Sequence, residues 1–166
     1  MNKPSNKQSI SFNEGHEFKK EVGIHLIKYL RRLSPEIEIP IHAKGITESR
    51  YYDVDIHISI KGKGLFASRG DIWVECEWKD TSSIREPDIQ KLVLKAQDAF
   101  RHVTESGGFY YDALIMVSNQ DYDIDALRYA NTFDVLCLRL YEGQLIAKNA
   151  PMNWVGDPAW MKQENN

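Results

Sequence analysis

The segment YYDVDIHISI, residues 51–60, alternates apolar and polar side chains with a period of two. Its polar positions are Asp53, Asp55, His57 and Ser59. The segment DIWVECEWKD, residues 71–80, repeats the pattern and carries Glu75, Glu77 and Lys79 on its polar side. Successive side chains of a strand point to opposite faces of its sheet, so the two segments predict strands at 51–60 and 72–79, each with one core face and one polar face. The glycine-rich linker between them predicts an antiparallel hairpin.

Apolar residues at helical spacing flank this hairpin on both sides. The stripe from Phe18 to Leu33 predicts a helix over about 14–33, with Asn13 as its cap. A second apolar stripe predicts a helix that opens at Pro87 and Asp88 and ends before the glycines at 107–108.

The rest of the chain predicts alternating strands and one short helix. The expected strands are 110–119, 134–141 and an edge strand at 144–148, and the short helix runs from 124 to about 129. Strands that are joined through a helix pair in parallel, so we expect an α/β fold with a mixed central sheet flanked by helices. The element order is α, β hairpin, α, β, α, β.

The composition bounds the class of protein. The 166 residues are 42% hydrophobic, which fits one domain over 1–166, with a polar start and an irregular tail docked by Trp154 and Trp160. The net charge is −3, which excludes a histone-like polycation. The sequence has no apolar run near the roughly 20 residues that cross a bilayer and no signal-like start, so we expect a cytoplasmic protein without a membrane segment. Cys76 and Cys137 have no CxxC spacing and are expected to be buried free thiols.

The hairpin places four carboxylates on two adjacent strands: Asp53, Asp55, Glu75 and Glu77. Like charges that face each other across a strand pair repel. A bound divalent cation such as Mg²⁺ would offset the repulsion, since hard cations take carboxylate oxygens. The alternative is a solvated acidic strand face.

The order of these residue types resembles the PD-(D/E)XK nuclease superfamily. An Asp on one strand, Asp55, precedes Glu77-Trp78-Lys79 on the next, with a Glu-bearing helix before and an apolar helix after. The resemblance covers about residues 14–141. It implies a restriction-endonuclease-like core and an endonuclease that depends on Mg²⁺, or Mn²⁺, and hydrolyses phosphodiester bonds in DNA rather than RNA.

The resemblance also implies roles for single residues. Asp55 and Glu77 would hold the metal, with the main-chain carbonyl of Trp78 as a further ligand. Lys79 would orient the attacking water or stabilise the charge of the transition state. Glu17 or Glu21 would take the acidic position of the first helix. The chain departs from the family pattern here, because the residue directly after Phe18 is Lys19.

Several other residues have two interpretations. Asp53 and Glu75 could hold a second metal or act as alternative ligands, and His57 could act as a base or be polar surface. Basic residues of the hairpin and the second helix could contact phosphates or be solvated. They are Lys61, Lys63, Arg69, Lys91 and Lys95.

Three functions follow from these patterns. The leading one is the nuclease, acting as a homodimer or as a subunit of a larger complex. The second is a non-catalytic nucleic-acid-binding or partner-dependent subunit with the same fold. The third is an α/β protein whose acidic face binds nothing. The sequence has no Walker loop, zinc spacing, nucleophile elbow or dinucleotide fingerprint that would favour another enzyme class.

Overall fold

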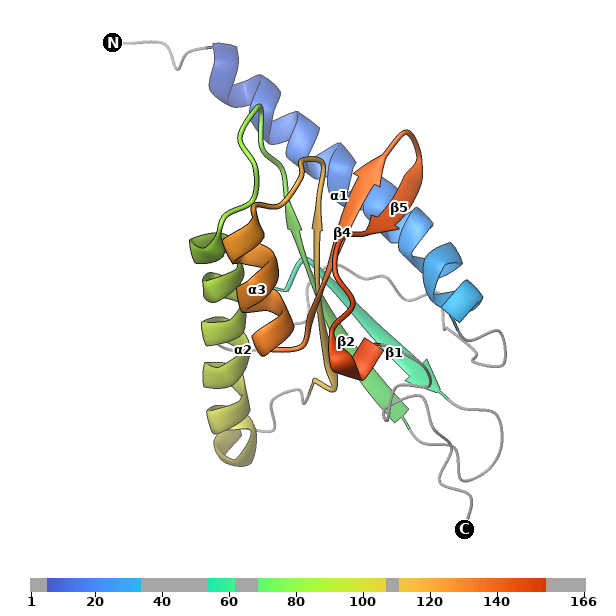
Figure 1. Cartoon of the computed structure of the whole chain (residues 1–166), viewed down its shortest axis with the longest axis vertical. Coiled ribbons are helices and arrows are strands. Elements are labelled where there is room, and N and C mark those ends of the chain that lie inside the picture. The colour runs from blue at the N-terminus through green and yellow to red at the C-terminus, as the bar shows by residue number, and fades with distance from the viewer. Residues whose placement is uncertain (1–5, 34–53, 62–68, 107–110, 155–166) are drawn as a thin grey trace.

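The computed structural model describes residues 6–33, 54–61, 69–106 and 111–154. Within these ranges, one five-stranded sheet is flanked by three α-helices (Figure 1). In chain order the elements are α1 (Asn6–Leu33), β1 (Ile56–Lys61), β2 (Arg69–Glu77), α2 (Glu86–Ser106), β3 (Ala113–Ser118), α3 (Ile124–Thr132), β4 (Val135–Tyr141), β5 (Gln144–Ala147) and the 3-10 helix η1 (Met152–Trp154).

The strands lie in the sheet in the same order as in the sequence, from β1 to β5. The pairs β2–β3 and β3–β4 are parallel, while β1–β2 and β4–β5 are antiparallel. The predicted α/β fold with a mixed sheet, an antiparallel hairpin and the expected element order is therefore confirmed. The carboxyl ends of β2, β3 and β4 point toward one edge of the sheet (Figure 1).

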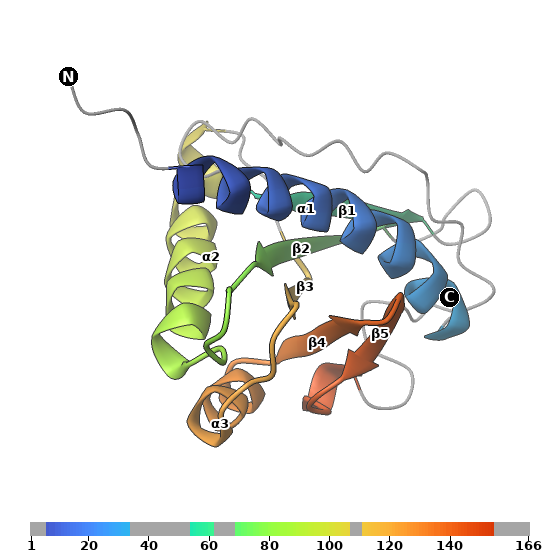
Figure 2. The same ribbon diagram turned by 90° about the horizontal axis from the view of Figure 1, so that it is seen from above.

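Helix α1 covers one face of the sheet, and α2 and α3 cover the other (Figure 2). The α1 face is buried because Phe18, Val22 and Leu26 follow one another at intervals of four residues and form one stripe. They pack on Ile72 and Val74 of β2. Burying a side chain of this size contributes about 1.5–3 kcal/mol.

The opposite face of β2 is buried as well, which corrects the expectation of a polar face. Trp73 is 1% exposed and packs with Ile89 and Leu92 of α2. The alternation of polar residues suggested a solvated face. The charge of Glu75, on this same face, is instead balanced by Lys95 of α2. The carboxylate of Glu75 therefore lies between the sheet and α2.

Several element boundaries differ from the prediction, among them the start of α1, the start of β1 and the end of β2. Helix α1 begins at Asn6, so Asn13 lies inside the helix and does not cap it. No Pro or Gly occurs from 6 to 14, and helical hydrogen bonding can extend back from the packed stripe. Strand β1 begins at Ile56 and β2 ends at Glu77, so Asp55 and Lys79 lie just outside the ladder. Residues 51–53 of the predicted strand lie outside the described ranges.

The C-terminal part of the sheet is closed by a tight hairpin. Glu142 and Gly143 both have positive φ angles, 48° and 71°, as a two-residue type I′ turn requires. Trp154 is buried and donates its indole N–H to the carbonyl of Asp134 at 3.3 Å, which confirms the docking predicted for it. Trp160 lies outside the described residues.

Two expectations from composition can also be compared with the structure. Cys76 and Cys137 are buried and free, as predicted. Over the described ranges, none of the helices combines the length and the apolar character needed to span a membrane.

Candidate functional site

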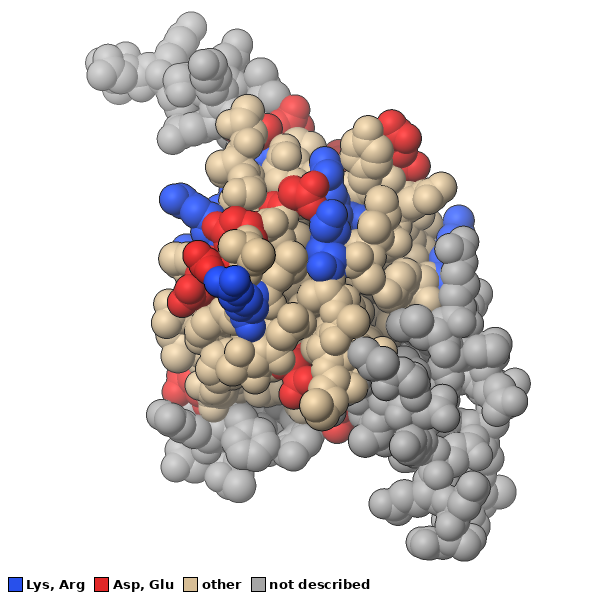
Figure 3. Space-filling view, in the orientation of Figure 1, with Lys and Arg blue, Asp and Glu red and all other residues tan. Residues whose placement is uncertain are grey.

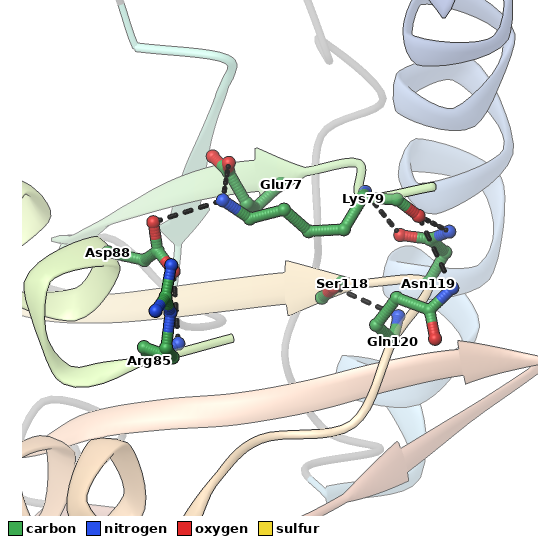
Figure 4. Close-up of polar contacts among 7 residues, drawn as sticks. All are labelled: Glu77, Lys79, Arg85, Asp88, Ser118, Asn119 and Gln120. Carbon is green, nitrogen blue, oxygen red and sulfur yellow. Dashed lines mark hydrogen bonds and ion pairs between the residues drawn. The ribbon is translucent and has the colours of Figure 1, made fainter. Parts of the chain in front are cut away.

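The carboxyl ends of β2 and β3 meet the amino end of α2, and polar side chains gather there (Figure 4). The parallel ladder ends at the pair Glu77↔Ser118, after which β2 leads toward α2 and β3 toward α3. Ligands of open α/β sheets commonly bind at the carboxyl ends of parallel strands. The sequence-predicted residues Glu77 and Lys79 both lie at this edge.

Lys79 bridges two carboxylates from different elements. Its Nζ lies 3.0 Å from Oε1 of Glu77 and 3.1 Å from Oδ1 of Asp88 at the start of α2 (Figure 4). Burial lowers the pKa of Lys79, but its hydrogen bonds to Glu77 and Asp88 outweigh burial and raise it. The ammonium therefore stays charged at neutral pH and is held in place by two partners.

Asp88 links this ion pair to the start of α2. Its Oδ2 accepts the backbone N–H of Arg85 at 3.0 Å, and its Oδ1 faces Lys79. Burial raises the pKa of Asp88, but the Arg85 hydrogen bond and Lys79 have the larger combined effect and lower it. Asp88 is therefore ionised at neutral pH and fixes the Lys79 side chain against the helix end.

The main chain of Lys79 is held by the segment that follows β3. The side chain of Asn119 accepts the N–H of Lys79 at 2.9 Å and donates to its carbonyl at 2.8 Å. Gln120 donates its amide to the carbonyls of Lys79 and Asp80, both at 3.3 Å. The buried hydroxyl of Ser118 accepts the N–H of Gln120 at 3.0 Å, which fixes this segment in turn.

Asp55 lies directly before the neighbouring strand, β1, and is bound by two other groups. Its Oδ2 accepts the backbone N–H of Cys76 at 2.9 Å, and its Oδ1 forms an ion pair with Lys19 of α1. Asp55 comes one residue before the first ladder pair, Ile56↔Val74. The next residue along β2 from that pair is Glu75, so the register brings Asp55 closer to Glu75 than to Glu77.

Glu75 joins the site through α2. Its Oε2 lies 2.8 Å from Nζ of Lys95. Burial raises the pKa of Glu75, the Lys95 hydrogen bond lowers it, and the charge of Asp55 raises it further, so the net shift is upward. Lys95, predicted to contact phosphates, is thus paired with a carboxylate of the sheet, while Lys91 is exposed to solvent.

The acidic residues of α1 point elsewhere. Glu17 is exposed and pairs with Lys20 at 2.8 Å, and exposed Glu21 lies 3.9 Å from Nε2 of His25. The helix side chain that meets Asp55 is Lys19. Lys19, the residue directly after Phe18, thus supplies a cation to the site.

The remaining predicted site residues lie at the margins of the site or outside the described residues. Trp78 directs its ring to the α1 side, 5.4 Å from the ring of Phe18. His57 lies 2.8 Å from Oδ1 of Asp71. Asp53 and Lys63 lie outside the described residues, as do the side chains of Lys61 and Arg69.

The carboxylates of the site form ion pairs with lysines. Among the residues that the structure describes, no group of three or more His, Cys, Asp or Glu side chains surrounds one metal position. Mg²⁺ commonly binds one or two carboxylates and completes its shell with water and substrate phosphate. Asp55 and Glu77 therefore suit Mg²⁺ or Mn²⁺ in donor type.

Comparisons with known proteins give one distant structural likeness. The chain is similar to part of the MspJI restriction endonuclease, solved in complex with a 27-mer oligonucleotide, with a TM-score of 0.48 and 13% sequence identity. The match covers 82% of this chain and 30% of that chain. No family model matches, and no curated protein matches.

Sequence reasoning missed four residues of this site: Lys19, Asp88, Asn119 and Gln120. Asp88 was noted only as the opening of the second helix, a position that favours acidic residues for a structural reason. Lys19 had a signal, because it is the position at which the sequence departs from the resembled pattern. Asn119 and Gln120 had none, since they meet Lys79 across about forty residues of sequence.

Proposed function

We propose that this protein is a metal-dependent endonuclease with a restriction-endonuclease-like core, hydrolysing phosphodiester bonds in DNA. The observation that carries the proposal is the Glu77–Lys79 pair. The carboxylate and the ammonium lie 3.0 Å apart at the carboxyl end of β2. The neighbouring strand is β1, and Asp55 directly precedes it. Two carboxylates can hold Mg²⁺, and a lysine beside them can stabilise the negative charge that develops when a phosphodiester bond is hydrolysed.

Asp55 and Glu77 would hold the metal, with the main-chain carbonyl of Trp78 as a further donor. When bound, Mg²⁺ or Mn²⁺ would supply Lewis-acid stabilisation of the phosphoryl oxygens and lower the pKa of a water. Lys19 and Lys79 now neutralise these carboxylates, so a bound cation would release the Lys19 ammonium toward substrate phosphate and leave Lys79 with Asp88 as its partner. Glu75 would serve as an alternative ligand.

Lys79 would act on the reacting phosphate itself. Its pKa is raised, so it stays cationic, and it would stabilise negative charge on the transferring group and orient the attacking water. Asp88 would keep the ammonium at the edge of the site through their 3.1 Å contact. Exposed Lys91 would add a phosphate contact at α2, together with Lys61, Lys63 and Arg69 of the hairpin. A homodimer would place two such sites on one duplex.

One observation favours a second candidate function, a DNA-binding subunit without catalysis. Asp55 is already neutralised by Lys19, where the resembled family has an acid on the first helix. In that case the lysines would remain bound to the carboxylates, and the protein would act through a partner.

The test compares wild type with Lys79→Ala and Glu77→Gln on plasmid, linear duplex, single-stranded DNA and RNA, in Mg²⁺, Mn²⁺ or EDTA. Lys20→Ala is the matched control, because Lys20 is an exposed lysine of α1 whose partner is Glu17. We expect DNA cleavage by wild type and the control, at least about 100-fold less by the two site variants, and none in EDTA.

Cleavage that survives in both site variants would contradict the site. Binding of DNA by wild type without cleavage in either metal would select the non-catalytic subunit.

A further inference from the structure

Arg139 stands in the same cross-strand row as Glu77. The register pairs Glu77 with Ser118, and Ser118 with Arg139. Val135 and Cys137, at the alternate positions of β4, pack in the α2 and α3 core, so Arg139 lies on the same side of the sheet as Glu77. Neighbouring strands are about 4.8 Å apart, which puts these two positions roughly 10 Å from each other along the sheet edge.

Arg139 has three neighbours at this edge. Its Nη1 lies 2.6 Å from Oδ2 of Asp121, and its Nε donates to the carbonyl of Asn119 at 3.4 Å. Its guanidinium lies 4.9 Å from the ring centre of Tyr141. Lys148 takes the other oxygen of Asp121 at 2.7 Å.

Two cations thus share one carboxylate, and the cluster of Arg139, Lys148 and Asp121 carries one net positive charge. The carboxylate of Asp121 is about half exposed, so another anion can replace it as the partner of Arg139 and Lys148. On the face drawn in Figure 3, lysine and arginine side chains lie beside acidic ones over the upper half, where Figure 1 places the carboxyl ends of β2, β3 and β4.

Tyr141 adds an aromatic surface to this cluster. It is 48% exposed and immediately precedes the type I′ turn at Glu142 and Gly143. The two-residue turn fixes the backbone next to Tyr141, and the guanidinium of Arg139 packs on its ring. A tyrosine ring next to an arginine is the kind of platform on which unpaired bases stack.

We propose that Arg139, Tyr141 and Lys148 bind a nucleotide that flanks the cleaved bond. Its phosphate would replace Asp121 as the partner of the two cations, and its unpaired base would stack on Tyr141. The distance from Glu77 equals the rise of about three stacked nucleotides. The inference rests on the proposed nuclease function, and it names the substrate as DNA with a single-stranded segment beside the cut.

The test measures binding of the full chain to a fluorescein-labelled single-stranded oligonucleotide and to a blunt duplex, by anisotropy in EDTA. Arg139→Gln and Tyr141→Ala are each expected to weaken single-strand binding roughly tenfold. Arg139→Gln should also lower the slope of log affinity against log salt by about one. Asp121→Asn should tighten binding, because it removes the competing anion. Arg128→Gln is the matched control, an exposed arginine of α3 paired with Asp125.

Three results would overturn the site: no binding of single strands by wild type, equal loss in the Arg128→Gln control, or weaker binding in Asp121→Asn. Thermal unfolding of each variant distinguishes a loss of folding from the loss of a DNA contact. Tyr141→Ala changes a side chain that is 48% exposed, so we expect little effect on folding. If the variants behave as expected while wild type cleaves nothing in Mg²⁺ or Mn²⁺, the nuclease proposal fails and this binding site stands.

Discussion

The side chain of Asn119 hydrogen-bonds both polar groups of the Lys79 main chain, at 2.9 and 2.8 Å. The two bonds continue the pairing of β2 with β3 beyond its last ladder pair, Glu77↔Ser118. The residue that carries the ammonium of the site is therefore fixed by a side chain from the segment that follows β3. Asn119 is a positioning residue for Lys79.

Asn119→Ala is expected to slow DNA cleavage at least about tenfold without weakening DNA binding, because Lys79 loses its anchor. The chain contains a matched control, since Asn149 accepts the N–H of Cys137 at 2.8 Å and donates to the carbonyl of Val135 at 2.9 Å. Each alanine variant should lose about 1–2 kcal/mol of stability. Cleavage kinetics, with amide hydrogen exchange at Lys79, check the prediction.

The exchange measurement applies even to a protein that cleaves nothing. Faster exchange of the Lys79 amide in Asn119→Ala, but not in Asn149→Ala, is expected in either case. Equal cleavage rates in the two variants would show that Asn119 contributes only to stability.

The Glu75–Lys95 pair should respond asymmetrically to mutation. Lys95→Met leaves a half-buried carboxylate without its cation and is expected to cost about 2 kcal/mol. Glu75→Gln removes the charge that burial disfavours and is expected to cost less than about 1 kcal/mol at neutral pH. Urea unfolding of both variants and wild type measures the difference, and equal losses would contradict it.

The same pair has a defined pH dependence. The folded state raises the pKa of Glu75 above its ordinary value of 4.5, mainly through burial. The folded state therefore binds the proton more tightly, and the stability that Glu75 contributes is complete below 4.5 and is lost as pH rises through the raised pKa. Glu75→Gln should gain stability relative to wild type as pH rises from about 4 to about 7. A constant difference would show that the carboxylate is not shifted.

Lys19 competes with a cation for Asp55. Lys19→Gln is expected to tighten Mn²⁺ binding severalfold, because the ammonium no longer pairs with Oδ1 of Asp55. Titration calorimetry measures the change, with Lys20→Gln as a control for the loss of one positive charge on α1. A gain of the same size in the control would mean that only net charge matters, and Asp55→Asn should abolish the gain.

Both thiols should be inert in the folded protein. Burial raises the pKa of Cys137 to about 12 and that of Cys76 well above its usual range, so neither forms a thiolate at neutral pH. Ellman's reagent should label two thiols in urea and neither in buffer. Labelling of Cys76 in buffer would indicate that the end of β2 opens on the time scale of the assay.

The parts of the fold that depend on local periodicity could be predicted from sequence. The stripe at Phe18 and Val22 predicted α1, and the alternation along β2 predicted which side of that strand Trp78 joins. Polar alternation could not show that the second face of β2 is also buried, because its carboxylate Glu75 is balanced by Lys95 from a later helix. The pattern of nearby residues shows which face of the sheet a side chain lies on, but it does not show which residue of another element the side chain contacts.

Contacts within the candidate site could be predicted only where the residues share one hairpin. Glu77 and Lys79 are two positions apart, so strand geometry and motif spacing brought them together. Asn119 reaches Lys79 from forty positions away, and Lys19 reaches Asp55 from thirty-six. Such contacts depend on how the helices and strands pack in three dimensions, and the spacing of nearby residues does not predict that packing.

The order of the strands in the sheet has a consequence for assembly of the chain. Because β1 to β5 lie side by side in the order of synthesis, each new strand can add to an open edge, and none has to insert between two that are already paired. The exception is α1, which precedes all five strands in the chain but packs in one core with residues from both edge strands, Ile56 of β1 and Leu145 of β5. Helix α1 therefore completes its packing only after the last strand of the sheet has been made.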